Sequence, residues 1–314
     1  MARSNPAPEG APMQDQTPQS FATIGANRAR SLVVRAEVRP PPASGYLIAE
    51  GDAWLDNPGY LAILETMERH HGFQVECAAG HGETAEEMAY DDRQLERFRK
   101  VFERLARTND AIGSTTPRAI LLSCGGNDVA HTLSTLINHV DSGLPVLDAE
   151  MVRSLIEDRV RSAVSSLIGS AMAFSDAYFK QMIPIFIHGN ARPVPDRRRY
   201  KRTGIRATGP WLRPGSADRA PAAASAQADG DLLRNAAEIA KIIDLFNDRV
   251  LASLPSVSPF TGIVHYIPLR PTLEGTAATA EQRRALRNMF GEDKASERAA
   301  KAIADAINAV DRRG

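Results

Sequence analysis

Short apolar runs alternate with longer segments of helical periodicity along most of the chain. The runs are bounded by glycine, proline or polar residues, which is typical of β-strands. They cover residues 46–49, 73–78, 119–124, 183–187 and 263–267. The run at 119–124 is apolar throughout, as expected of a parallel strand that is covered on both faces. Strands that alternate with helices predict βαβ units.

Apolar residues at helical spacing follow these strands. The longest such pattern covers Glu150–Lys180, and Gly169-Ser170 is the place where this helix could break. Asp231 suits the N-cap of a helix that extends to about Leu254. A short polar helix at 281–289 and an amphipathic terminal helix complete the pattern. Together these elements predict an α/β fold, a three-layer α/β/α sandwich with a five-stranded, mainly parallel sheet.

Two segments depart from this alternation. Residues 1–42 are rich in proline, alanine, glutamine and serine, so they cannot offset the entropy of ordering, and we predict a disordered N-terminal tail. The remainder, 43–314, is predicted to be one domain. Within it, residues 190–230 combine clustered arginines with an alanine-rich run and are too long for an ordinary connection. We predict a basic, partly disordered insertion there, and a solvated charge run is favoured over a phosphate-binding patch.

Composition and charge narrow the range of partners. The chain has 314 residues, of which 43% are apolar, enough to bury a sizeable core. Its 38 basic and 38 acidic residues balance, so no overall charge favours nucleic acid or an anionic membrane. No stretch approaches the roughly 18 apolar residues of a membrane-spanning helix, and the patch at Ser31–Val34 is too short for a secretory signal. We expect no nucleic-acid or membrane partner and a cytoplasmic location.

The two cysteines fit the same location. Cys77 and Cys124 lie in apolar runs that we predict to be adjacent strands. Buried thiols in such runs are usually structural, and two cysteines do not make a disulfide framework. A reducing compartment is therefore expected.

Polar, glycine-rich turns follow three of the predicted strands. They are Gly51-Asp52-Ala53-Trp54, His81-Gly82-Glu83-Thr84 and Gly125-Gly126-Asn127-Asp128. The carboxyl ends of parallel strands meet at one edge of a sheet, and α/β proteins bind their ligands at that edge. The three turns therefore predict one shared site.

In this order, the three turns resemble the first three sequence blocks of the SGNH/GDSL hydrolases, which cleave esters with a Ser-His-Asp triad. The resemblance implies a flavodoxin-like fold, a small-molecule acyl or acetyl ester as ligand, and no cofactor or metal. It implies an oxyanion hole formed by the Ala53 N–H, the Gly82 N–H and the Asn127 side chain. We also expect Asp52, Trp54 and His188 to contact substrate. Segments 184–189, 193–196 and 209–212 resemble a bacterial branch of the family, which extends the match to about residues 46–273.

The chain departs from this family at the catalytic positions. Position 53, which carries the nucleophilic serine in the family, is alanine, and no histidine follows His265. Residues 288–291, where the family carries Asp-x-x-His, contain neither residue. We expect His265 to pack against the sheet. Serine and histidine act as a unit, so losing both leaves no useful esterase, whereas a backbone N–H is unaffected by Ser→Ala.

Two functions therefore stay open. One is an ester hydrolase, as the resemblance implies. The other is a non-catalytic protein that binds a small acyl or acetylated ligand, or a partner protein, in a retained oxyanion-hole pocket. The missing catalytic residues favour the second. The oligomeric state stays open as well.

Two further alternatives are weaker. Ser123 or Cys124 could replace the nucleophile, but both belong to an apolar strand, where such groups are normally structural. A metal-dependent phosphoesterase could use Asp52, Asp56, Asn127, Asp128 and His188 as ligands. The chain lacks the further histidines that such a two-metal site needs, so we expect no metal.

Overall fold

The computed structural model describes residues 42–52, 55, 63–80, 83–112, 116–129, 136, 144–145, 147–192, 240–274 and 294–311. All of them belong to one compact unit, Pro41–Gly314. The predicted tail, except residue 42, lies outside these residues. So do the predicted helix at 281–289 and all but 190–192 of the predicted insertion. Among the described helices, none has both the length and the apolar character needed to cross a membrane.

Within the described residues, five parallel strands form a single sheet, as the apolar runs predicted. The strands are β1 (Tyr46–Gly51), β2 (Gln74–Cys77), β3 (Pro117–Ser123), β4 (Ile185–His188) and β5 (Val264–Ile267). Their order is β2-β1-β3-β4-β5, and every neighbouring pair is parallel. This is the flavodoxin-like order, which reverses direction between β1 and β3. The predicted fold class is confirmed.

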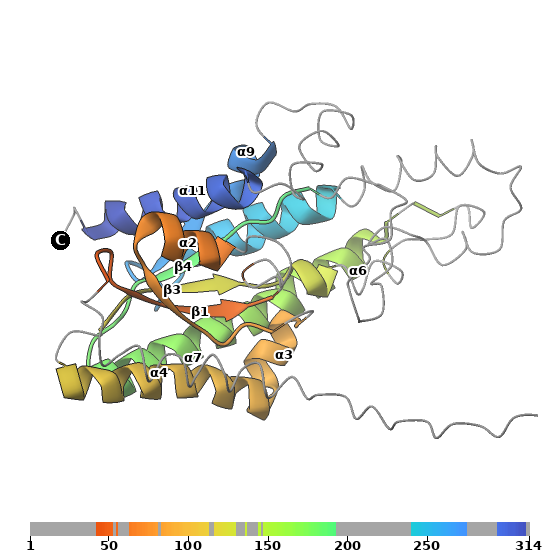
Figure 1. Cartoon of the computed structure of the whole chain (residues 1–314). Coiled ribbons are helices and arrows are strands. Elements are labelled where there is room, and N and C mark those ends of the chain that lie inside the picture. Colours follow the sequence, from red (N-terminus) through yellow and green to blue (C-terminus); the bar gives the residue numbers. More distant parts are fainter. Residues whose placement is uncertain are drawn as a thin grey trace, which may run out of the picture. The chain divides into compact units, whose positions relative to one another are not determined.

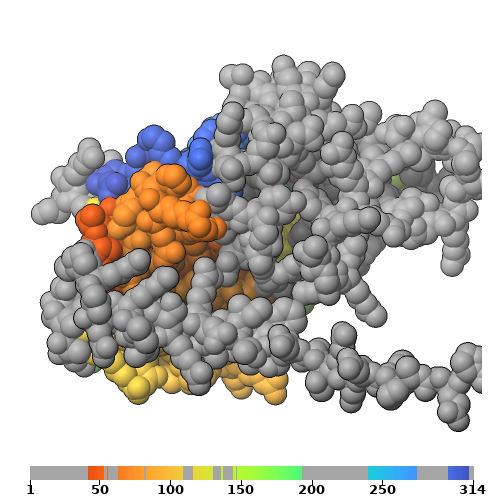
Figure 2. Space-filling model, viewed as in Figure 1, coloured from red at the N-terminus to blue at the C-terminus, as the bar shows by residue number. Residues whose placement is uncertain are grey.

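Helices cover both faces of the sheet (Figure 1). On one face lie α2 (Ile63–His71), α9 (Leu269–Glu274) and α11 (Lys294–Asp311). Figure 2 shows the side chains of α2 in orange beside those of α11 in blue, and these two helices contact each other. On the other face lie α3 (Ala85–Tyr90), α4 (Asp92–Ile112), α6 (Ala149–Arg153) and α7 (Arg161–Phe179). The short α9 was not predicted.

Side chains that alternate along the strands pack into two hydrophobic cores, one on each face of the sheet. Along β1, Ile48 packs toward α4 and α7, whereas Leu47 and Ala49 pack toward α2 and α11. The first core contains an aromatic cluster in which Phe98, Phe102 and Phe174 meet edge to face. Because both faces of the strands are buried, only the ends of the sheet can present polar groups to a ligand.

The long helix predicted over residues 150–180 is irregular near its start and not at Gly169-Ser170. α6 continues through π-helical turns at Ser154–Val160 into α7, which runs through Gly169 without a break. Gly169 is exposed, so a glycine there removes no packing contact. The π-helical turns pack against a second π-helical segment, Phe246–Val250. The irregularity thus follows tertiary packing and not the local glycine.

Two other predictions need correction. The helical pattern that follows the second predicted strand forms two helices, α3 and α4, and not one continuous helix, because Asp91 adopts an extended backbone. The Asp91 carboxylate accepts hydrogen bonds from the N–H groups of Arg93 and Gln94. Cys77 and Cys124 do not lie on adjacent strands, because β1 separates β2 from β3. Neither thiol takes part in a disulfide.

A glycine pair tests how β1 and β3 meet. A Cβ on Gly51 would lie 2.5 Å from the Ser123 carbonyl oxygen, whereas a Cβ on Gly169 would meet nothing within 4 Å. We expect Gly51→Ala to lower the free energy of unfolding by about 1–3 kcal/mol. Gly169→Ala, inside a helix, should raise it by about 0.5–1 kcal/mol. Urea unfolding measures both, and equal effects of the two substitutions would contradict the packing described.

Candidate functional site

The carboxyl ends of β1, β3 and β4 meet at one edge of the sheet. Asp52 follows β1, and its N–H donates to the Ser123 carbonyl oxygen over 3.2 Å. Gly126 lies just beyond β3, and Asn190 just beyond β4. The point where a Cβ of Gly126 would stand is 3.2 Å from Asn190 Oδ1 and 3.8 Å from Asp52 Oδ2. The three strand ends therefore lie close together at this edge.

Part of the predicted site lies outside the described residues. Ala53, Trp54 and Gly82 are among those positions, so the three-donor oxyanion hole stays a prediction. Asp52, Asn127 and His188 are described, and all three are buried.

Asn127 braces the turn that follows Gly82. Its Nδ2 donates to the Glu83 carbonyl oxygen over 2.9 Å. An asparagine amide carries two hydrogens, and no partner among the described residues takes the second one. The neighbouring Asp128 accepts a hydrogen bond from the Ala85 N–H over 2.7 Å at the start of α3. Asn127 and Asp128, at the end of β3, thus both hold the turn that follows Gly82.

The same turn is fixed from its other side by a capping box. Thr84 Oγ1 accepts from the Glu87 N–H over 3.1 Å, and Glu87 Oε2 accepts from the Thr84 N–H over 2.8 Å. Glu83 forms an ion pair with Arg97 of α4. Residues 83–85 are therefore held by both side-chain and backbone contacts.

Glu50 is a buried carboxyl that the sequence reasoning missed. It lies in β1, is only 2% exposed, and its Oε2 has no hydrogen-bond partner within the described chain. Burial raises the pKa of Glu50 to about 8, with a further increase from the charge of Glu83 and an opposing effect of Arg97. The side chain is thus mainly protonated at neutral pH. The available signal was an acidic residue inside an otherwise apolar strand.

The two alternative nucleophiles are poorly suited to that role. Ser123 is buried, and its Oγ donates to Asp52 Oδ1 over 3.0 Å. Cys124 is buried as well, and burial raises the pKa of its thiol well above the ordinary value, with a further increase from the charges of Asp128 and Asp52. The thiol is therefore protonated at neutral pH and lacks the reactivity of a thiolate.

The two described histidines of the sheet also differ from a solvent-accessible base. His188 ends β4 and is buried, and its Nδ1 lies 3.3 Å from the Gly189 carbonyl oxygen. Burial lowers the pKa of His188 to about 4, so its imidazole is neutral at neutral pH. His265 lies within β5 and stacks on Phe186 with ring centroids 4.9 Å apart. Its predicted packing against the sheet is confirmed.

Asn190 is a second residue that the sequence reasoning did not place in the site. Its N–H donates to Asn247 Oδ1 over 2.9 Å, and Asn247 Nδ2 donates back to the Asn190 carbonyl oxygen over 2.8 Å. Two residues later, Arg192 makes a bidentate contact with Asp244. The partners lie more than 50 positions away in the sequence, so no local motif could have indicated them.

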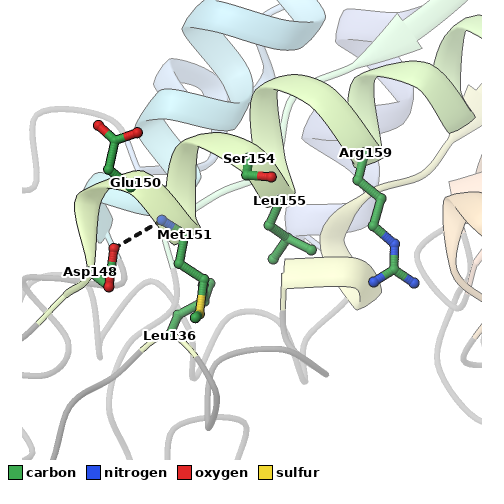
Figure 3. A pocket seen from close by; sticks show the side chains of 7 residues that line it. All are labelled: Leu136, Asp148, Glu150, Met151, Ser154, Leu155 and Arg159. Carbon is green, nitrogen blue, oxygen red and sulfur yellow. Dashed lines mark hydrogen bonds between the residues drawn. The ribbon is translucent and has the colours of Figure 1, made fainter.

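An open hollow of about 570 Å³ lies beside the start of α6 (Figure 3). It is lined by Leu136, Asp148, Glu150, Met151, Ser154, Leu155 and Arg159. Its polar groups have partners within the protein, since Asp148 caps α6 through the Met151 N–H at 3.0 Å and Arg159 pairs with Glu86. None of the predicted site residues lines this hollow. The part of the chain that the structure describes contains no group of three or more His, Cys, Asp or Glu side chains that could hold a metal ion.

No protein-family model and no curated protein matches the chain. Several solved structures show a distant similarity to the chain, and two of them are the following. One is described as a platelet activating factor from Streptococcus pneumonia, with 13% identity, a TM-score of 0.41, and coverage of 92% of this chain and 100% of that one. The other is described as a GDSL-like lipase from Parabacteroides merdae, with 11% identity, a TM-score of 0.36, and coverage of 86% and 98%. Similarity this low says nothing about what the chain binds or catalyses.

The raised pKa of Glu50 predicts a pH-dependent stability. A carboxyl with a folded-state pKa of about 8 and an ordinary value of 4.5 stabilises the fold fully below pH 4.5, and this contribution is lost as pH rises to 8. Glu50→Gln should therefore raise the free energy of unfolding at pH 9 by on the order of 2 kcal/mol and change it little at pH 4.5. Urea unfolding at both pH values measures this. The exposed Glu150→Gln serves as control, and an equal effect of Glu50→Gln at both pH values would contradict the assignment.

Proposed function

We propose that this chain binds a small acyl or acetylated ligand at the carboxyl edge of its sheet and does not hydrolyse it. The proposal rests mainly on alanine at position 53, in a Gly-Asp turn that otherwise resembles the nucleophile turn of the SGNH/GDSL hydrolases. A serine hydroxyl at this position is the group that attacks the ester in that family, and a methyl group cannot replace it.

Among the described residues, we find no group that is suited to replace the missing triad. Ser123 donates its hydroxyl hydrogen to Asp52, and the Cys124 thiol is protonated and buried. No histidine follows His265 in the sequence, so the histidine that acts as general base in the SGNH/GDSL hydrolases has no counterpart near the C-terminus. Hydrolysis would need both an activated nucleophile and a base within hydrogen-bond reach.

Binding needs much less than hydrolysis. A carbonyl oxygen is held by N–H donors that point into a preorganised space, and the backbone N–H of residue 53 is present whether the side chain is serine or alanine. The Asn127 amide is buried, is oriented by the Glu83 carbonyl, and has a second hydrogen available. These features favour a retained pocket for the carbonyl oxygen of an ester or of another acyl group.

The opposing candidate is an active ester hydrolase, as the sequence resemblance implies. Restoring the nucleophile separates the two functions. If only the serine is missing, Ala53→Ser should hydrolyse a small aryl ester with saturation kinetics. If the base is missing as well, general-base assistance worth roughly 10² to 10⁴ in rate is also absent.

We expect Ala53→Ser to stay within about tenfold of background in the hydrolysis of an aryl acetate, because its hydroxyl has no imidazole to accept the proton. Ala53→Gly, which adds no nucleophile, is the matched control. Initial rates over a range of ester concentrations provide the measurement. Saturable turnover by Ala53→Ser alone would overturn the non-catalytic proposal and direct the search for the base to His81, His131 and His188.

A further inference from the structure

Asn190 carries a buried side-chain amide with unused hydrogen-bonding capacity. The residue is only 6% exposed, and its Nδ2 has no hydrogen-bond partner among the residues that the structure describes. Buried amide groups in folded proteins are nearly always paired, because an unpaired N–H loses its hydrogen bonds to water without replacement. A ligand atom that accepts this hydrogen bond would account for the arrangement.

The backbone of Asn190 is held in place, which fixes the point from which its side chain extends. The two hydrogen bonds with Asn247, one in each direction, fix both the N–H and the carbonyl group of Asn190. Asn247 itself is 1% exposed and lies in the π-helical segment Phe246–Val250. π-helical turns occur frequently at functional sites. Two residues later, the guanidinium group of Arg192 donates hydrogen bonds to both carboxylate oxygens of Asp244.

The Asn190 side chain lies at the carboxyl edge. A Cβ on Gly126 would stand 3.2 Å from Asn190 Oδ1 and 3.8 Å from Asp52 Oδ2, so a glycine at this position lets the Asn190 amide lie close against the end of β3. Asn127, the adjacent residue, provides the amide that the proposed function assigns to the carbonyl group of the ligand. The ends of β3 and β4 thus each bring an asparagine to this edge.

The charges around this edge disfavour an anionic ligand. Three buried or half-buried acidic residues gather there, namely Asp52, Glu83 and Asp128, whereas the neighbouring Glu50 is mainly neutral at neutral pH. Four guanidinium groups near the same elements are each in an ion pair with a carboxylate: Arg97 with Glu83, Arg159 with Glu86, and both Arg192 and Arg270 with Asp244. A carboxylate ligand would meet acidic neighbours without a free cation from this set. A neutral carbonyl compound accepts hydrogen bonds without that repulsion.

We propose that Asn190 is a second amide donor to the ligand and that, together with Asn127, it selects a neutral acyl group, an ester or an amide, over a carboxylate. This inference rests on the proposed function, because it assumes a ligand at the carboxyl edge. It adds a residue from β4 to a site that the sequence assigned mainly to the ends of the first three strands, and it specifies the charge of the ligand.

A pair of nearly isosteric probes tests the inference on the full chain. N-methylacetamide is a neutral acyl compound, and sodium acetate is its anionic counterpart. Binding of each is followed by titration with NMR detection at neutral pH. We expect the unmodified protein to bind N-methylacetamide about tenfold more tightly than acetate, and Asn190→Asp to weaken that binding about tenfold, as loss of one hydrogen bond to a ligand implies. Asn308→Asp, the same change near the end of α11, should have no effect.

Two further variants keep the test decisive. Gly126→Ala places a methyl group against the Asn190 side chain while leaving the bonds between Asn190 and Asn247 intact. It should also weaken N-methylacetamide binding, and it serves as the second test of Asn190 if Asn190→Asp is poorly folded. Asn127→Asp tests the proposed function separately. If Asn127→Asp weakens N-methylacetamide binding but neither Asn190→Asp nor Gly126→Ala does, the role of Asn190 is overturned and the proposed function stands. Equal or tighter binding of acetate would overturn the selection of a neutral group, and binding of neither probe would overturn the proposed function together with this inference.

Discussion

The close contact between β1 and β3 at their carboxyl ends is the constraint on which the candidate site depends. Gly51 approaches the Ser123 backbone so closely that no side chain fits between them. The contact continues into Asp52, whose N–H donates to the Ser123 carbonyl oxygen and whose carboxylate accepts from the Ser123 hydroxyl. A buried carboxylate is tolerated only when it is hydrogen-bonded. The pairing therefore stabilises the edge and at the same time occupies the hydroxyl of Ser123.

The rest of the edge is built outward from this contact by buried polar pairs. β3 continues into Asn127 and Asp128, which hold the turn at 83–85 through its carbonyl and N–H groups. β4 continues into Asn190, which the reciprocal bonds with Asn247 hold in place. Reciprocal polar pairs such as Asn190 with Asn247 rigidify a site, because each partner would be left unsatisfied in any other arrangement. Three potentially reactive groups described at this edge, Ser123, Cys124 and His188, are buried.

The sequence predicted the strands and the parallel sheet because continuous apolar runs are a local signal. It did not predict that Cys77 and Cys124 lie on strands separated by β1, because strand order is a property of the whole sheet. It also missed Asn190, whose role depends on Asn247, a residue 57 positions away. Glu50 was overlooked for a different reason, since its carboxyl lies in a strand that is otherwise apolar. Of the predicted site, Asp52, Asn127 and His188 are placed at the sheet edge, whereas Ala53, Trp54 and Gly82 lie outside the described residues.

Covalent labelling gives the most direct test of the central claim, that this edge retains a binding site without an activated nucleophile. A fluorophosphonate forms a stable adduct with a serine only when a neighbouring base activates the hydroxyl. We expect intact mass measurement after incubation with a small fluorophosphonate to show no stoichiometric adduct, either on the unmodified chain or on Ala53→Ser. One adduct per chain on either protein would reveal an activated nucleophile with its base and would contradict the claim.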